Sequence, residues 1–286
     1  MRSASLLLLL ALMPVAASAW GDGCKFRADR AAGVDAKGVE KVVIRSGAGD
    51  MKVVGIGNAV RIEARGPACA AKQELLDATQ IHVRREGNVV YVETALPQNE
   101  GGWSWGNNEY AYIDIGIALP STIPVEALDS SGDAAFEGLH ALTLQDSSGD
   151  LNLERIAGLV DVSDSSGDID IEQVGSVRLR DSSGDIDVDD VKGDVDIVLD
   201  SSGDIEVANV DGSVKVQQDS SGSIRIEDVK GSVSVDSDSS GDIYAGRVDG
   251  NFTVSEDSSG TIEHGSIGGK VSVPNNKRDD GNRDVE

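Results

Sequence analysis

The chain has 286 residues and a formal net charge of −25, from 50 acidic and 25 basic side chains. This charge repels phosphate backbones and anionic lipid surfaces, which excludes nucleic acid as a natural partner. Aromatic residues make up only 3% of the chain while glycines number 34, which excludes a core built around large rings.

Residues 1–19 have the features of a secretory signal peptide. Arg2 precedes an apolar run from Leu6 to Val15, and Ala17-Ser18-Ala19 forms a small-residue cleavage site. The apolar run is shorter than the roughly 20 residues of a membrane-spanning helix. We therefore expect cleavage before Trp20 and a periplasmic or secreted mature chain without a transmembrane segment.

Two cysteines, Cys24 and Cys69, remain after cleavage. In an exported chain the expected state of two lone cysteines is a disulfide. A reactive thiol pair or half of a metal site is the alternative, but no Cys-x-x-Cys spacing or histidine cluster accompanies the cysteines. The bridge would tie the N-terminal segment to a loop.

Residues 20–128 are expected to form an irregular N-terminal part of a repeat structure. Gly49-Asp50-Met51-Lys52-Val53 followed by Val60-Arg61-Ile62 reproduces one two-strand repeat, with inward side chains predicted at Met51, Val53, Ile56, Val60 and Ile62. A short helix is predicted around residues 71–78. Such insertions can cap a stack of repeats and prevent edge-to-edge growth.

A polar loop is predicted over residues 98–108, with Trp103 and Trp105 among glycines and asparagines. Amphipathic rings on a loop can stack on sugars or anchor a protein partner. The alternative is that both rings fold over the side of the molecule and cover apolar side chains. The two tryptophans are therefore a candidate ligand-binding loop.

The motif Asp-Ser-Ser-Gly recurs eight times within residues 129–273, at steps of 17 to 19 residues, which is the signature of a repeat architecture. Glycines alternate at spacings of 9 and 10, and most precede a short alternating strand such as Asp185-Ile186-Asp187-Val188. Each coil thus has two strands and two turns. We predict an all-β parallel β-solenoid, or β-helix, with the right-handed sense that parallel crossovers favour. The polar residues 274–286 are predicted to be disordered.

Alternation along each strand predicts which side chains point inward, because successive residues of a strand face opposite sides. In the coil that begins at Asp200, the predicted inward residues are Ile205, Val207, Val210, Val214 and Val216. The same positions in the two flanking coils are also β-branched, so stacking buries columns of these side chains: Ile186, Val188, Val191, Val195, Ile197, Ile224, Ile226, Val229, Val233 and Val235.

Two further columns consist of aspartates, one at the start of the Asp-Ser-Ser-Gly motif and one just after its glycine. Asp at the first and Gly at the fourth position is typical of a type I turn in which the carboxylate caps a backbone N–H. Calcium binding by the stacked carboxylates is the alternative, although the Gly-Gly-x-Gly-x-Asp pattern of calcium β-rolls is not found. The candidate calcium ligands are Asp146, Asp150, Asp164, Asp168, Asp181, Asp185, Asp200 and Asp204.

No catalytic residue is predicted. A glycosidase needs an acid and a base in different environments, so one coil should break the pattern, whereas every coil carries nearly the same Asp and Ser. The histidines, His82, His140 and His264, lie outside any nucleophile motif. A carbohydrate-active enzyme on a β-helix and a calcium-binding repeat protein stay the alternatives to a binding scaffold, and no other cofactor is indicated.

The repeats Ser148-Gly149-Asp150-Leu151 and Ser202-Gly203-Asp204-Ile205, with Ile117-Ala118-Leu119-Pro120 before them, carry a resemblance to a known family. From about Val39 to Val273 the chain resembles the bacterial putative-adhesin family of β-solenoid domains of unknown function. The resemblance implies a β-solenoid that binds an envelope, glycan or protein partner, and it carries over no functional residue.

Overall fold

The structure is a computed structural model that describes residues 24–97 and 109–274. Three predictions fall outside these residues: the signal peptide, the loop with Trp103 and Trp105, and the tail beyond Pro274.

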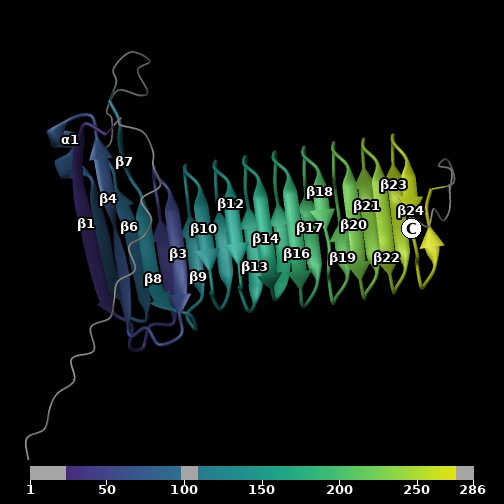
Figure 1. Cartoon of the computed structure of the whole chain (residues 1–286), viewed down its shortest axis with the longest axis horizontal. Helices are drawn as coiled ribbons and strands as arrows, with labels where there is room; N and C mark the ends of the chain where they lie inside the picture. Colours follow the sequence, from purple (N-terminus) through teal and green to yellow (C-terminus); the bar gives the residue numbers. More distant parts are fainter. Residues whose placement is uncertain (1–23, 98–108, 275–286) are drawn as a thin grey trace, which may run out of the picture.

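The described chain forms a long rod of stacked strands with a broader N-terminal end (Figure 1). Two sheets enclose one continuous apolar core. The first sheet, of 13 strands, contains β1 (Phe26–Asp35), β3 (Met51–Ile56), β4 (Arg61–Ala70), β7 (Ala111–Ile113), β8 (Ile115–Pro120), β10 (Ala134–Glu137), β12 (Leu151–Glu154), β14 (Ile169–Val174), β16 (Ile186–Val191), β18 (Ile205–Val207), β20 (Ile224–Val229), β22 (Ile243–Val248) and β24 (Ile262–His264). The second sheet, of 12 strands, contains β2 (Lys41–Arg45), β5 (Gln80–Glu86), β6 (Val89–Ala95), β9 (Val125–Leu128), β11 (Leu142–Gln145), β13 (Leu159–Ser163), β15 (Ser176–Arg180), β17 (Val195–Leu199), β19 (Val214–Val216), β21 (Val233–Asp238), β23 (Phe252–Asp257) and β25 (Val271–Ser272).

The repeats form the predicted parallel β-solenoid, because each coil adds one strand to each sheet. β16 pairs in parallel with β18, and Ile186 lies opposite Ile205. β17 pairs in the same way with β19, and Val195 lies opposite Val214. All the inward residues predicted for these coils are buried, which confirms the register derived from the period of two.

In the N-terminal part of the rod, the order of the strands in space differs from their order in the chain. β2 lies between β6 and β9, and β3 lies between β8 and β10, all in parallel pairs. The chain therefore forms the β2–β3 coil first, adds β6 and β8 on its outer side, and then crosses to β9 on its inner side. The coil that forms, β2–β3, is the second layer of the parallel stack. The predicted coil is wrong in its second strand, because residues 60–62 lead into β4 of the first sheet and not into the second sheet.

The predicted inward positions of this coil are right for Met51, Val53 and Ile62, which are buried, and wrong for two others. Ile56 is 45% exposed and Val60 is 72% exposed. After Ile56 the chain does not cross to the second sheet, as a regular coil would. It reverses into β4, which runs antiparallel to β1 and β8, so the turn residues between β3 and β4 face solvent.

Antiparallel strands and one helix close the N-terminal end of the rod. β1 and β5 form the outer edges of the two sheets, and α1 (Gln73–Ala78) confirms the predicted helix. The Arg30 guanidinium on β1 donates hydrogen bonds of 2.8 Å to the carbonyls of Leu76 and Thr79 at the end of α1. Charged side chains on both edge strands oppose the pairing of a further strand.

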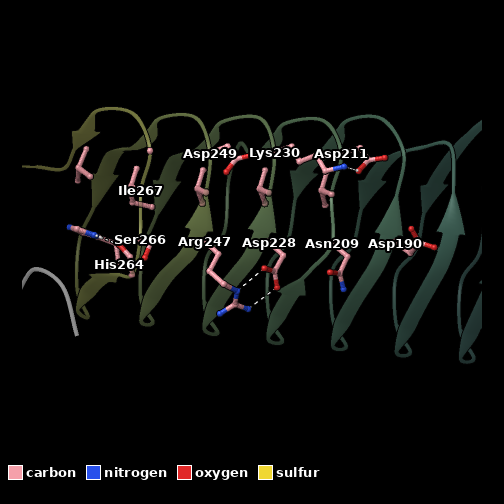
Figure 2. Close-up of a pocket in the computed structure, with 16 residues that line it drawn as sticks. Asp190, Asn209, Asp211, Asp228, Lys230, Arg247, Asp249, His264, Ser266 and Ile267 are labelled. Carbon is pink, nitrogen blue, oxygen red and sulfur yellow. Dashed lines mark hydrogen bonds and ion pairs between the residues drawn. The ribbon is translucent and has the colours of Figure 1, made fainter. Parts of the chain in front are cut away.

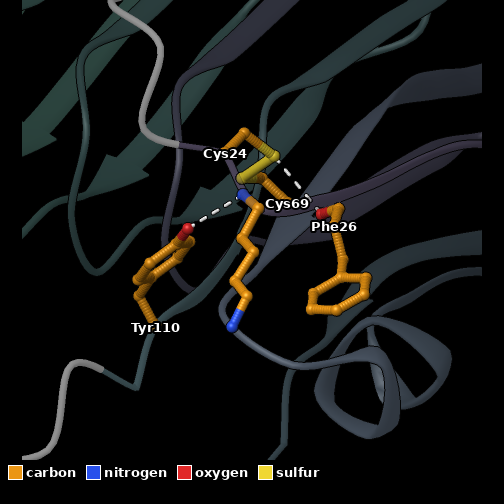
Figure 3. Close-up of a disulfide and its surroundings, with 5 residues drawn as sticks. Cys24, Phe26, Cys69 and Tyr110 are labelled. Atoms are coloured by element: carbon orange, nitrogen blue, oxygen red, sulfur yellow. Dashed lines mark hydrogen bonds between the residues drawn. A yellow bond between two sulfur atoms is a disulfide. The ribbon is translucent and has the colours of Figure 1, made fainter.

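The Cys24–Cys69 disulfide confirms the predicted bridge and joins the chain just before β1 to β4, with 5.7 Å between the Cα atoms (Figure 3). Cys69 lies on β4 and not on the predicted loop. The Lys25 backbone N–H beside it donates a 3.0 Å hydrogen bond to the Tyr110 hydroxyl, just before β7. Three segments distant in sequence are thereby held together at the capped end.

Among residues 24–97 and 109–274, no helix has the length and apolar character needed to cross a lipid bilayer.

Candidate functional site

The first aspartates of the eight Asp-Ser-Ser-Gly motifs form a column inside the rod, which we call the buried aspartate column. None is more than 5% exposed, and Asp200 and Asp219 are fully buried. The members are Asp129, Asp146, Asp164, Asp181, Asp200, Asp219, Asp238 and Asp257. Asp238 lies directly opposite Asp219 and Asp257 in the parallel register, so neighbouring members are one strand spacing apart, about 4.8 Å.

Hydrogen bonding satisfies these carboxyls only in part. Asp200 Oδ1 accepts from the Ser202 N–H at 3.3 Å, and Asp238 Oδ1 accepts from the Ser240 N–H at 3.1 Å, the turn cap that the sequence predicts. Asp200 Oδ2 and Asp238 Oδ2 are buried without a hydrogen-bond partner. A buried carboxylate oxygen without a donor is costly, so the ionised form is disfavoured.

Burial also raises pKa values within the column. Burial, reinforced by the neighbouring carboxyl of Asp181, raises the pKa of Asp200 to about 6. Burial raises the pKa of Asp219 to about 6 and that of Asp129, at the capped end, to about 7. From Asp129 to Asp238 the column is therefore a set of acids that hold protons more tightly than exposed aspartates do.

The aspartates after each glycine form a separate, exposed ladder, and here the carboxylates have a clear structural role. Asp168 Oδ1 accepts from the Asp185 N–H at 3.0 Å, and Asp185 Oδ1 accepts from the Asp204 N–H at 2.9 Å. Each carboxylate thus caps the backbone of the next coil where the first strand begins. The same bond joins Asp150 to the Asp168 N–H at 3.1 Å and Asp204 to the Ser223 N–H at 2.8 Å.

The predicted calcium ligands are divided between these two columns. Asp146, Asp164, Asp181 and Asp200 belong to the buried column, and Asp150, Asp168, Asp185 and Asp204 belong to the exposed ladder. In the part of the chain that the structure describes, no three His, Cys, Asp or Glu side chains are grouped so that they could hold one ion. Calcium binding by these aspartates stays a prediction.

A second concentration of charge lies on the outer face of the first sheet, and we call it the acidic patch. It consists of five carboxylates on β14, β16 and β18: Asp170, Glu172, Asp187, Asp189 and Glu206. Asp170 lies opposite Asp187, and Asp187 opposite Glu206, in the parallel register. Burial, together with Asp170 and Glu206, raises the pKa of Asp187. None of the five forms an ion pair within the described chain.

The acidic patch ends at Arg225, which follows Glu206 in the register. Its guanidinium stacks 4.6 Å from the centre of the Tyr244 ring and lies 2.9 Å from Glu227. The Arg225 guanidinium therefore contacts Tyr244 and Glu227. The five carboxylates of β14, β16 and β18 face solvent together.

A groove of about 900 Å³ runs along one corner of the C-terminal coils (Figure 2). Asp228 and Arg247 lie on one wall, where the guanidinium donates bonds of 2.6 and 2.7 Å to the carboxylate. On the other wall, the Lys230 ammonium lies 2.7 Å from Asp211. Asp211 and Asp228 of the groove are thus ion-paired, in contrast to the carboxylates of the acidic patch.

One wall of this groove has a backbone feature that the sequence analysis did not predict. Six residues other than glycine have φ between 50° and 58°: Arg155, Gln173, Asp190, Asn209, Asp228 and Arg247. Each comes directly before an inward apolar residue at the end of the first strand, where the chain turns the corner. Asp and Asn tolerate this left-handed conformation better than Arg or Gln does. The presence of Asp190, Asn209 and Asp228 at these positions was therefore the feature of the sequence that could have indicated a left-handed conformation.

The remaining predicted residues do not form a site. His82 lies on β5, His140 between β10 and β11, and His264 on β24, so the histidines lie on separate coils. His264 is partly exposed at the last coil, with its ring centre 6.3 Å from that of Phe252. Trp103 and Trp105 lie outside the described residues.

One family profile and several solved structures are similar to this chain. The family profile described as Toastrack DUF4097 matches residues 70–284. A solved structure described as a "putative adhesin" from Parabacteroides merdae is 12% identical, with 89% of this chain and 98% of that chain covered and a TM-score of 0.46.

Two further solved structures are similar at 14% identity. One is a "putative cell adhesion protein" from Clostridium sporogenes, with 87% of this chain and 100% of that chain covered and a TM-score of 0.30. The other is a "Putative lipid binding protein" from Parabacteroides distasonis, with 88% and 95% covered and a TM-score of 0.35. No curated protein matches the chain.

Proposed function

Because the chain belongs to the Toastrack DUF4097 family, a β-solenoid family of unknown function, we propose its role from its surface: an exported, non-enzymatic, adhesin-like scaffold whose acidic patch binds a cationic partner of the cell envelope. The observation that carries this proposal is the set of five carboxylates on three adjacent strands without an ion pair in the described chain. Complementary charge at such a surface accelerates association and selects the partner.

The fold supports the scaffold role because the patch lies on a continuous sheet. Asp170, Asp187 and Glu206 alternate with fully buried side chains on their strands, which fixes their spacing along the rod. A partner with basic groups at intervals of about 5 Å could meet one carboxylate per coil. Residues held on strands are positioned more accurately than residues on loops.

The test of the patch is a triple variant with Asp170→Asn, Asp187→Asn and Glu206→Gln. The matched control removes the same charge from the second sheet, with Asp161→Asn, Asp196→Asn and Asp236→Asn. Each protein is immobilised and exposed to an envelope extract at low and at high salt. We expect wild type and control to capture the same partner at low salt and to release it at high salt, and the patch variant to capture none. Equal capture by all three proteins would contradict the proposal.

The non-enzymatic part of the proposal rests on the uniformity of the coils, since a catalytic pair needs two carboxyls in different environments. Incubation of the mature protein with envelope polysaccharides should release no new reducing ends. Their appearance would favour a carbohydrate-active enzyme instead.

Export is tested separately. N-terminal sequencing of the protein from a periplasmic or secreted fraction should begin at Trp20. A chain that retains residues 1–19 in the cytoplasm would exclude an envelope partner.

A further inference from the structure

We propose that the buried aspartate column is a proton-binding ladder: neighbouring carboxyls share protons between coils, so the rod takes up protons as it folds and is most stable in mildly acidic surroundings. This inference does not depend on the partner of the acidic patch.

The buried aspartate column brings like groups together on adjacent coils. Asp219 lies directly opposite Asp238 in the parallel register. Asp146 and Asp164 follow the paired residues Gln145 and Ser163 on adjacent coils, so their carboxyls are neighbours in the same way. Two carboxylates cannot hydrogen-bond, because neither has a donor. If one of the two is protonated, its O–H donates to the other carboxyl, and oxygens that otherwise have no partner are satisfied.

Within the described chain, no positive charge compensates the column between Asp129 and Asp238. The groups that face Asp200 are Asp181 and Asp219 of the adjacent coils, Asp185 of the exposed ladder, and the turn serines. Asp181 faces Asp164 and Asp168, while Asp129 faces Asp146 and Ser46. Asp238 faces Asp219 and Asp257. From Asp129 to Asp238, no Lys, Arg or His of the described chain forms an ion pair with a member of the column.

The column is continuous over eight coils at one strand spacing, and each member has a neighbour of the same kind on at least one side. A fully ionised column would bury a row of like charges about 4.8 Å apart in a medium of low dielectric constant. Protons supplied by the solvent remove this repulsion and need no movement of the backbone.

The direction of the pH dependence follows from the titration. An aspartate in the unfolded chain ionises near its ordinary pKa of 3.8, whereas the pKa of Asp146, Asp200, Asp219 and Asp238 is about 6. Between these values the folded rod holds protons that the unfolded chain has released. Stability therefore falls as the pH rises from about 4 to about 7. A pKa raised by two units changes the ratio of folded to unfolded protein by about 100-fold across this window.

The experiment compares wild type with Asp181→Asn, Asp200→Asn and Asp219→Asn in one protein. Asparagine has the shape of the protonated acid and cannot ionise. We expect the melting temperature of wild type to fall between about pH 5 and about pH 7.5, and the variant to melt higher than wild type at the upper pH with a smaller slope. The matched control is Asp168→Asn, Asp185→Asn and Asp204→Asn in the exposed ladder, which should keep the pH slope of wild type.

A measurement on unmodified side chains covers the case in which the variant does not fold. With isotope-labelled aspartate, the infrared carbonyl band of protonated carboxyls should persist in the folded protein at about pH 5.5, where exposed aspartates are ionised. The complete loss of this band while the protein is folded, or an Asn variant with the same pH slope as wild type, would overturn the proposal.

Calcium provides a second discriminating test, because a bound cation could replace the shared protons. With a proton ladder, millimolar calcium and magnesium should raise the melting temperature at about pH 7.5 by the same small amount, through screening. A much larger shift with calcium that also removes the pH dependence would overturn the proton ladder and establish the calcium prediction.

Discussion

A single position along a strand decides whether a side chain belongs to the core or to the surface. Val214 is 1% exposed, and Lys215, the next residue, points outward and forms a 2.9 Å ion pair with Asp236. The alternation is strict because one sheet face is buried along the whole rod.

Val214→Asp should therefore destabilise the protein by about 3 to 5 kcal/mol, since it buries a charge without a partner. Lys215→Gln should cost less than about 1 kcal/mol, the usual value of an exposed ion pair. Urea denaturation of both variants measures the difference. Equal losses would mean that the assigned register is wrong by one residue.

At the scale of the elements, the turns between strands restrict which residue types can occupy a position as strongly as the core does. Gly203 has φ of 130°, and a Cβ atom on it would lie 1.8 Å from the Gly184 carbonyl oxygen of the preceding coil. The turns therefore stack in direct backbone contact, and only glycine fits.

Gly203→Ala should cost more than about 2 kcal/mol, because the strained φ and the steric overlap add to each other. Gly57→Ala is the matched control, since its Cβ would have no atom within 4 Å, and it should be nearly neutral. Thermal melting of the two variants tests this prediction. A tolerated alanine at position 203 would show that adjacent turns can separate.

The disulfide acts on the capped end and not on the repeats. It closes a loop with a sequence separation of 45 residues, for which chain entropy alone gives a stabilisation of roughly 4 kcal/mol. In a protein with Cys24→Ser and Cys69→Ser, β1 and β4 should exchange amide hydrogens faster, while β14 to β22 keep their protection. Hydrogen exchange followed by mass spectrometry resolves these segments. Uniform acceleration along the chain would instead mean that cap and repeats unfold together.

At the scale of the whole molecule, charge is segregated along the rod. Residues 129–274 contain 32 acidic and 9 basic side chains, a net charge of −23, whereas residues 24–97 and 109–128 contain 12 of each. The capped end is therefore neutral, and the repeats carry nearly all of the net charge. Self-repulsion of this kind opposes the compact state.

The melting temperature should accordingly rise with added sodium chloride, most steeply below about 0.15 M, where the Debye length falls to about 8 Å. The salt effect should shrink at about pH 4.5, because protonation has then removed part of the charge. Calorimetry at two pH values and several salt concentrations measures both effects. A melting temperature independent of salt at neutral pH would show that local hydrogen bonds outweigh the repulsion.

The sequence by itself determined the parallel solenoid, the two strands per coil, the inward columns and the disulfide. The strand features depend on local rules, because a period of two assigns Ile205 and Val207 to one face whatever the rest of the chain does. The disulfide follows from the presence of two lone cysteines in a chain expected to be exported. The helix at the capped end was also predicted from a local stretch of the sequence.

Only the tertiary structure decided the order of the N-terminal coils, the exposure of Ile56 and Val60, and the burial of the aspartate column. The order of coils depends on which strands pair, and β3 can be followed equally well by a crossover or by a reversal into β4. An aspartate at the start of a turn has the same sequence signature whether its carboxyl faces water or the core. The stacking of eight identical turns encloses these carboxyls, so their environment follows from neighbours 17 to 19 residues away in the chain.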